Sequence, residues 1–261
     1  MRSLVLLLTV FSACASAPKV TRSYARINGM NLYYEVHGSG PEVVLIHGSF
    51  CTIDGCFGKL LPELAKTHRV IAMELQAHGH TADIDRTFTV TNLVGDVVAL
   101  MDVLGVKKAD VVGYSLGSSV ALELALTRPG RVKKLVMATT AFSPDGVKPR
   151  GPVRLDDLKG TPTLEGYQRV APHPEQLPRL VARINESDPF KAQSPTEISA
   201  SKIPMLLVFA DDDLVTREHA VEFFKLLDGQ KKSRLAVIPG TTHATLMESA
   251  SLAPLVNDFL R

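Results

Sequence analysis

The 261-residue sequence predicts an α/β fold in which a mostly parallel sheet lies between layers of helices. Three observations predict it: short, nearly continuous apolar runs, helical apolar periodicity between those runs, and an ordinary globular composition. With 45% hydrophobic and 21% charged residues, the chain buries enough apolar surface to fold. The formal net charge of +2 gives no strong field for a polyanion, so we expect no nucleic-acid partner.

Residues 1–17 have the composition of an export signal. Arg2 precedes the apolar residues 4–11, and small residues follow as far as Ala17, a candidate cleavage site. The run is shorter than the roughly 20 apolar residues of a spanning helix. Phe-Ser-Ala-Cys14 also resembles a bacterial lipoprotein box, in which Cys14 would carry a lipid anchor to the membrane. We therefore expect a periplasmic, membrane-anchored or secreted protein; the alternative is a buried N-terminal strand.

The predicted domain, residues 24–261, begins with a β-hairpin. Residues 24–27 and 31–37 flank Asn28-Gly29, a pair that supplies the positive φ angles of a type I′ turn. Six apolar runs of strand length follow. Nearly continuous burial is typical of parallel strands that are covered on both faces, and we predict such strands at 43–46, 69–73, 109–112, 134–138, 205–209 and 234–238.

Helices are predicted between these strands. Residues 89–104 carry apolar side chains at three- and four-residue steps and stop at Gly105. Residues 116–127 form a second helix, and residues 217–227 form a third. Strand and helix in repetition predict a doubly wound sheet, in which sites gather at the carboxyl ends of the strands.

Residues 139–202 interrupt this alternation. The segment contains nine of the 16 prolines and has weak apolar periodicity. So long an excursion without a strand is typical of a functional lid, so we predict a short cap here. The cap and the segment after Gly48 are expected to line the substrate pocket.

A serine stands where the strand at 109–112 meets the next helix, in Gly113-Tyr-Ser115-Leu-Gly117. Gly-x-Ser-x-Gly alone is a weak motif, expected by chance about 0.1 times in such a chain. Its strand-to-helix context makes it specific, because the strained turn exposes the hydroxyl at a helix amino terminus. We predict Ser115 as a nucleophile; the alternative is a glycine-tolerant turn with an incidental serine.

A base and an acid follow later in the chain. His243 lies in a loop of small residues after the last predicted strand, and Asp211, Asp212 and Asp213 follow the preceding one. The histidine would act as general base, and an aspartate would fix its tautomer and stabilise the imidazolium. The alternatives are a solvated loop histidine and an aspartate that only caps a helix.

Backbone amides that could stabilise an oxyanion follow the strand at 43–46. It ends in His47-Gly48-Ser49-Phe50, and Gly48 permits close approach of the backbone. The amides of Ser49 or Phe50, together with that of Leu116, could converge on a tetrahedral oxyanion. His47 is interpreted as structural.

From about Tyr24 to Arg261 the sequence resembles the bacterial α/β-hydrolase superfamily of small esterases, lipases and cofactor-free haloperoxidases. The resemblance rests on His47-Gly48, on the serine motif, on Gly240-Thr-Thr-His243 and on the loop from Glu74 to Thr81. It implies the α/β-hydrolase fold: a mostly parallel eight-stranded sheet flanked by helices, with the cap as an insertion.

The chain departs from the family pattern in two segments. Glu74 and Ala77 stand where relatives commonly carry Asp and Gly. The acid segment is usually Gly-x-x-Asp followed four residues later by Pro, and here Ala210 and Arg217 take the Gly and Pro positions. That spacing selects Asp213 as the acid, with Asp211 as the alternative.

The resulting hypothesis is a serine hydrolase that cleaves a small carboxylic ester, thioester or lactone through an acyl-enzyme, without a cofactor. The alternatives are perhydrolase or haloperoxidase-like activity with the same three residues, and a non-catalytic binding module on the same scaffold. Glu74, His78 and His80 could suggest a metal site, but a zinc site usually needs three or four converging ligands, so no metal site is predicted. The sequence carries no signal for a particular oligomeric state.

Cys51 and Cys56 flank four residues that include Asp54 and Gly55. In an oxidising compartment two cysteines so close in sequence can pair. A disulfide requires Cα atoms about 5.5 Å apart, so the segment would have to turn. The alternative is a pair of small buried hydrophobic side chains.

Overall fold

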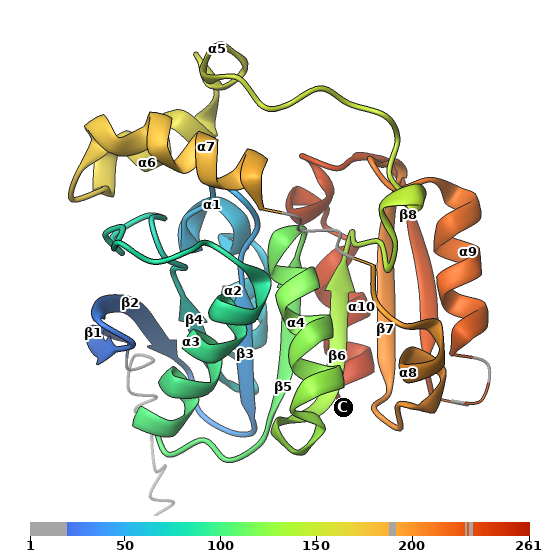
Figure 1. The fold of residues 1–261 in the computed structure, drawn as a ribbon. Helices are drawn as coiled ribbons and strands as arrows, with labels where there is room; N and C mark the ends of the chain where they lie inside the picture. Colours follow the sequence, from blue (N-terminus) through green and yellow to red (C-terminus); the bar gives the residue numbers. More distant parts are fainter. Residues whose placement is uncertain (1–19, 188–191, 228, 230–231) are drawn as a thin grey trace, which may run out of the picture.

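The computed structural model describes residues 20–187, 192–227, 229 and 232–261; the predicted export signal and Cys14 lie outside the described residues. An eight-stranded sheet with the order β1-β2-β4-β3-β5-β6-β7-β8 forms its centre, and helices cover both faces (Figure 1). The predicted fold class is therefore confirmed. The strands are β1 (Thr21–Ile27), β2 (Met30–His37), β3 (Glu42–Ile46), β4 (Arg69–Met73), β5 (Ala109–Tyr114), β6 (Val132–Ala138), β7 (Met205–Asp212) and β8 (Arg234–Thr242).

The sheet is parallel except at one edge. The hairpin of β1 and β2 pairs antiparallel with itself and with β4, whereas the remaining strand pairs are parallel. Asn28 and Gly29 have φ angles of 46° and 83°, as the predicted hairpin turn requires. β8 forms the opposite edge of the sheet.

Successive side chains of the central strands enter two different cores. In β5, Val111 packs in the core under α3 (Val90–Val103), α4 (Leu116–Thr127) and α9 (Arg217–Leu226). The neighbouring Val112 packs in the core under three other helices, which explains why the strand reads as continuously apolar. Those three helices are α1 (Ile53–Phe57), α2 (Leu60–Leu64) and α10 (Leu252–Leu260).

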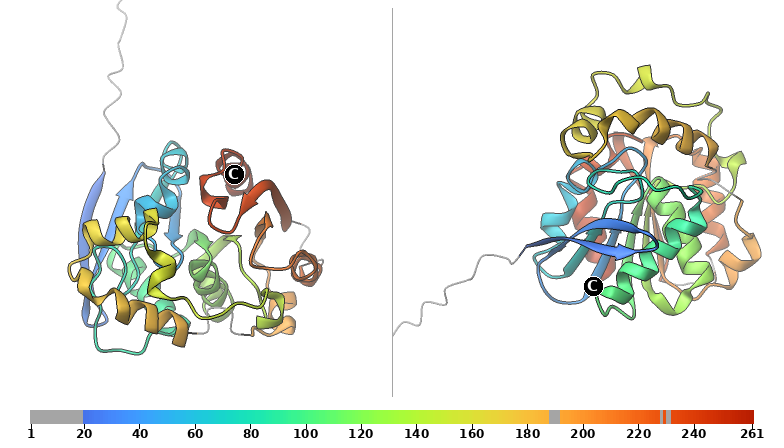
Figure 2. Two further views of the ribbon diagram at one scale, coloured as in Figure 1. Left: turned by 90° about the horizontal axis from the view of Figure 1, so that it is seen from above. Right: turned by 60° about the vertical axis from the view of Figure 1, so that its left-hand side comes forward.

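The predicted cap segment divides into two parts. Three helices lie above the carboxyl ends of the strands (Figures 1 and 2): α5 (Leu155–Leu158), α6 (Pro162–Val170) and α7 (Leu177–Glu186). α8 (Pro195–Ala200) instead packs beside α9. Four short 3₁₀ turns complete the elements: η1 (Pro129–Arg131), η2 (Pro144–Gly146), η3 (Pro174–Gln176) and η4 (Leu246–Glu248).

The expectation of weak periodicity in this segment is wrong for α7. This helix buries Leu177, Leu180, Val181 and Ile184, which are spaced by three and four residues along one face. None of the helices within the described ranges combines the length and apolar character needed to cross a bilayer.

An ionic cluster joins α7 to the loop after β4. The buried Asp83 carboxylate accepts a hydrogen bond from Nε of Arg183 at 2.8 Å and forms an ion pair with Nε of Arg179 at 2.7 Å. Arg183 also donates to the backbone carbonyls of Ile84 and Arg86. The cap is therefore docked on the core by these two arginines and by the apolar face of the same helix.

Candidate active site

Ser115 is held in a strained turn between β5 and α4. Its φ of 52° and ψ of −118° fall in a region that non-glycine residues rarely occupy, which costs about 1–3 kcal/mol. The surrounding backbone compensates: the Ser115 amide donates to the Ala138 carbonyl of β6 at 2.9 Å. The hydroxyl is thereby fixed at the carboxyl edge of the sheet, at the start of a helix.

The two glycines of the motif have no room for side chains. A Cβ on Gly113 would overlap the backbone of Gly117, and a Cβ on Gly117 would overlap the carbonyl oxygens of Ile46 and His47. Close packing of α4 against β3 and β5 thus explains the glycines, as the sequence pattern predicts.

The structure brings Ser115, His243 and Asp213 together from three separate strand ends. His243 Nε2 lies 3.0 Å from the Ser115 Oγ, and His243 Nδ1 lies 2.9 Å from Asp213 Oδ1. The carboxylate of Asp213 is almost fully buried. It also accepts hydrogen bonds from the amides of Ala210 and Leu214, at 3.0 and 2.7 Å.

Asp211, the alternative acid, lies elsewhere. Its carboxylate accepts the amides of Gly240 and Thr241 at 2.9 and 3.0 Å, and these bonds lower its pKa. Asp211 therefore braces the loop that leads to His243, and the partner of the imidazole itself is Asp213.

Tyr114 is a site residue that the sequence analysis did not single out. Its hydroxyl donates to the backbone carbonyl of His243 at 2.8 Å, and burial raises its pKa, so the phenol remains a neutral donor. The sequence feature that could have pointed to Tyr114 is its position between Gly113 and Ser115 in the serine motif. The residue ties the loop of the histidine to the strand of the serine.

The loop after β3 passes directly beside Ser115. A Cβ on Gly48 would lie 3.1 Å from the Ser115 Cβ. Ser49 and Phe50 follow and line the same cavity as Ser115, and Phe50 has a left-handed φ of 62°. Leu116 begins α4, so its amide belongs to the first turn, where amides have no intrahelical acceptor.

The His47 side chain connects this loop to the segment after β4 through two hydrogen bonds. Its Nε2 accepts the Leu75 amide at 3.0 Å, so Nδ1 carries the proton and donates to the Gly48 carbonyl at 2.7 Å. Complete burial lowers the pKa of His47 to about 3, so the ring stays neutral. This geometry agrees with the interpretation of His47 as structural.

A cavity of about 280 Å³ opens at Ser115 between the core and the cap. Its apolar wall includes Val153, Leu158 and Ile184 from the cap segment, and Leu214 and Met247 from the core. Arg150, Thr163 and Glu248 add polar groups. The pocket thus draws on the cap and on the segment after Gly48, as expected from the sequence.

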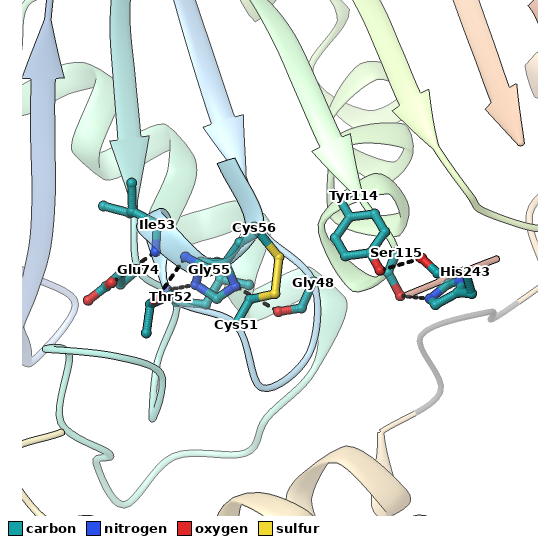
Figure 3. The surroundings of a disulfide bond; sticks show 12 residues. Gly48, Cys51, Thr52, Ile53, Gly55, Cys56, Glu74, Tyr114, Ser115 and His243 are labelled. Atoms are coloured by element: carbon teal, nitrogen blue, oxygen red, sulfur yellow. Dashed lines mark hydrogen bonds between the residues drawn. A yellow bond between two sulfur atoms is a disulfide. The ribbon is translucent and has the colours of Figure 1, made fainter. Parts of the chain in front are cut away.

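Cys51 and Cys56 form a disulfide, with their Cα atoms 5.9 Å apart, and both line this cavity (Figure 3). Cys51 precedes Thr52, the N-cap of α1, and Cys56 lies within that helix, so the segment turns between them. The prediction that the two cysteines can pair is confirmed in the structure.

The buried Glu74 carboxylate accepts the Ile53 amide at 3.0 Å and contacts Nδ1 of His80 at 2.8 Å. His78 turns elsewhere, with its Nδ1 2.8 Å from the Gln76 carbonyl. Within the part of the chain that the structure describes, no three His, Cys, Asp or Glu side chains are arranged to hold a metal ion.

A model of the Alpha/beta hydrolase family matches residues 43–256. A dihydrolipoyllysine-residue acetyltransferase component of an acetoin cleaving system, from Cupriavidus necator, is 29% identical over 220 residues. That alignment covers 83% of this chain but 49% of the relative, so the chain spans about half the relative's length. "Putative carbamate hydrolase RutD" from Azorhizobium caulinodans is 27% identical over 247 residues, covering 85% of this chain and 91% of that protein.

Solved structures show the same fold. The 2-hydroxy-6-oxo-6-phenylhexa-2,4-dienoate hydrolase BphD from Rhodococcus sp. strain RHA1 superposes with a TM-score of 0.73 at 20% identity, over 94% of this chain and all of that one. The enol-lactonase from Burkholderia xenovorans LB400 gives 0.68 at 21% identity, over 91% and 99%. The chain therefore belongs to the alpha/beta hydrolase family and is an enzyme of that family.

Proposed function

We propose that the chain is a serine hydrolase that cleaves a small carboxylic ester, thioester or lactone by acyl transfer. The supporting observation is the continuous chain of hydrogen bonds from Ser115 Oγ through His243 to Asp213, at 3.0 and 2.9 Å. A buried carboxylate on Nδ1 leaves Nε2 free to accept a proton from the serine. That arrangement makes a hydroxyl nucleophilic near neutral pH.

In the proposed reaction, His243 takes the Ser115 proton at Nε2 while Oγ attacks the substrate carbonyl. Amides of Leu116 and of Ser49 or Phe50 donate to the resulting oxyanion. His243 then protonates the leaving alcohol, and a water molecule deprotonated by His243 hydrolyses the acyl-enzyme. The chain's own residues supply each proton transfer, and no cofactor takes part in the scheme.

The cavity supports a small substrate. Its volume of about 280 Å³ lies at the lower end of the range for small-molecule pockets, and its wall is mainly apolar. The name of the RutD relative also refers to hydrolysis at a carbonyl carbon. A short acyl chain on an activated alcohol, such as p-nitrophenyl butyrate, is therefore the first substrate to test.

The first test compares the wild type with Ser115→Ala. We expect steady hydrolysis of p-nitrophenyl butyrate by the wild type and a fall in kcat of about 10⁴-fold or more in the variant. An aryl phosphonate should label Ser115 of the wild type, as mass spectrometry of peptides would show. Equal turnover by the two proteins would refute the proposed nucleophile, and a wild type that neither turns over nor becomes labelled would favour a binding module.

We also propose that the protein is exported, with a small-molecule ester as its partner. The support is the signal-like sequence of residues 1–17 together with the disulfide, which is typical of oxidising compartments. Lipid attachment at Cys14 predicts that the wild type sediments with membranes and that Cys14→Ser does not. Cell fractionation of the two proteins distinguishes the anchored form from a freely secreted one.

A further inference from the structure

The Cys51–Cys56 disulfide joins the loop that follows β3 to helix α1. Cys56 lies in α1, is buried, and packs in the core that also contains α2 and α10. Cys51 is half-buried and directly follows Phe50 in the loop beside Ser115. The bond therefore connects the loop that carries the proposed oxyanion amides to a buried residue of α1.

Hydrogen bonds anchor the helix side of this connection. The Ile53 amide donates to Glu74 at 3.0 Å, and the Gly55 amide donates to the Thr52 hydroxyl at 3.0 Å. Both bonds lie after Cys51 in the chain (Figure 3). They fix the start of α1 and leave the position of Phe50 to be set by other contacts.

On the loop side the Phe50 ring is buried in the core, whereas the backbone around it is held less tightly. The Cys51 amide reaches the Gly48 carbonyl at 3.4 Å, near the limit of a hydrogen bond. Between these two residues, Phe50 holds a left-handed φ of 62°, a conformation that persists only where its surroundings enforce it. The buried Phe50 ring supplies part of this enforcement, and the covalent bond from the next residue to the buried Cys56 supplies the rest.

We propose that the Cys51–Cys56 disulfide is a positioning bond for the oxyanion amides of Ser49 and Phe50. It acts through the backbone and does not touch the reacting atoms. The inference rests on the proposed function, because it assigns these amides to the acyl-transfer transition state. Breaking the bond should therefore lower kcat with little change in KM, since the amides contribute to the transition state more than to substrate binding.

The bond can be opened chemically in the native protein. A dithiol such as dithiothreitol supplies two electrons and two protons, leaves Cys51 and Cys56 as thiols, and becomes a cyclic disulfide itself. Misplacing a catalytic donor by about 1 Å can cost on the order of 100-fold. We expect kcat for p-nitrophenyl butyrate to fall by between about 10- and 100-fold on full reduction, with KM changed by less than about twofold.

A tetrahedral analogue provides a second readout. An alkyl boronic acid adds to Ser115 Oγ and places an anionic oxygen where the oxyanion would lie. Its affinity should weaken in parallel with kcat/KM, whereas affinity for the free alcohol product should not change. A bond that only stabilised the fold would leave the boronic acid affinity of the folded protein unchanged.

Two variants control the experiment. Cys51→Ser/Cys56→Ala should reproduce the low kcat without reductant. Cys14→Ser removes the third cysteine and keeps the disulfide, so it should respond to reductant as the wild type does. Thiol counts with a chromogenic disulfide reagent establish the extent of reduction, and near-ultraviolet circular dichroism establishes that the protein remains folded.

Full reduction with kcat unchanged would overturn the inference, as would a loss of activity that follows the loss of the circular dichroism signal. A reductant effect that disappears in Cys14→Ser would overturn it as well. These results leave the proposed function intact, provided that the oxidised wild type hydrolyses the ester and Ser115→Ala does not. An inactive oxidised wild type would instead count against the proposed function.

Discussion

The two walls of the cavity are held in different ways. On the core side, residues at the ends of β5, β7 and β8 are fixed by backbone hydrogen bonds, such as that from the Ser115 amide to Ala138. On the cap side, α7 is docked through side chains: Arg183 and Arg179 contact the buried Asp83, and the apolar face of the helix packs in the core. The core wall is therefore held by backbone hydrogen bonds, whereas the cap wall is held by contacts between side chains.

This difference separates the proposed chemistry from substrate selection. Strand ends in a packed sheet leave little freedom, because a small shift of one strand displaces its neighbours. Cap residues such as Val153 and Ile184 line the pocket without belonging to the sheet. Substitutions in the cap should therefore change which ester fits, whereas substitutions at the strand ends should change the rate at which every ester reacts.

The largest difference in kcat is expected between variants of two aspartates at the end of β7, on the core side of the cavity. Asp213→Asn should lower kcat by about 10³- to 10⁴-fold, because an amide cannot stabilise the imidazolium and favours the wrong tautomer. Asp211→Asn should lower it by about tenfold or less, since Asp211 only braces the loop at Gly240 and Thr241. Steady-state kinetics on p-nitrophenyl butyrate measures both.

The order of the two effects is the decisive result. A greater loss in Asp211→Asn than in Asp213→Asn would assign the acid role to Asp211. Circular dichroism spectra of the two variants serve as the control, because both substitutions preserve the shape of the side chain.

Removing the contact between Arg183 and Asp83 should affect stability and KM more than kcat. Arg183→Met leaves Asp83 buried with one partner fewer, so we expect about 2 kcal/mol lower stability. KM for a longer acyl ester should rise by about three- to tenfold while kcat changes by less than about twofold. Urea unfolding and steady-state kinetics measure the two effects.

Arg179→Met is the matched control, because Arg179 contacts the same carboxylate but is about half exposed. Its effect on stability should stay below about 1 kcal/mol. A fall in kcat as large as that of Asp213→Asn, in either arginine variant, would show that the cap wall takes part in the chemistry.

A separate effect concerns the pH dependence of stability. Burial lowers the pKa of His47 to about 3 and that of His78 to about 4, against 6.5 in the unfolded chain. The unfolded state therefore binds more protons below pH 6.5. The free energy of unfolding should therefore fall as the pH drops below 6.5, by roughly 1 kcal/mol per pH unit for each histidine down to about pH 4.

His78→Phe should remove one of these contributions, so the slope between pH 6 and pH 5 should decrease by roughly 1 kcal/mol per unit. His173→Gln, at an exposed position, is the control and should keep the slope of the wild type. Urea unfolding at several pH values tests this. An unchanged slope in His78→Phe would show that the buried ring is protonated in the folded protein.

His80 contributes with the opposite sign. Its hydrogen bond to Glu74 raises its pKa, so it stabilises the fold at pH values below its unfolded pKa. That contribution is lost as the pH rises through the folded pKa. Because about a third of the His80 side chain is exposed, solvent screening reduces the effect below that of the two buried rings.

The sequence predicted the elements whose pattern has a direct physical cause. Parallel strands such as β3 and β4 appear as apolar runs because both faces are covered, and their observed bounds lie within one residue of the predicted ones. Asn28-Gly29 predicted its turn because few other pairs accept two positive φ angles. The motif around Ser115 predicted a strained junction, which the φ of 52° confirms.

The remaining features depend on contacts between residues distant in sequence. Nothing local indicates that Asp211 reaches two amides near His243, or that the Tyr114 hydroxyl meets the carbonyl of that residue. The short helices α1 and α2 were not predicted, since five residues are too few to show a period. The spacing in α7 was visible but was obscured by the many prolines around it.

β8 lies at the edge of the sheet and has β7 as its neighbour, yet it leads directly to His243. Edge strands are among the first elements to open as a protein is warmed, and their amides exchange hydrogen earlier than those of central strands. Inactivation is therefore expected at a temperature below the midpoint of global melting. Opening of this strand alone would withdraw the imidazole while β3, β5 and β6 remain paired.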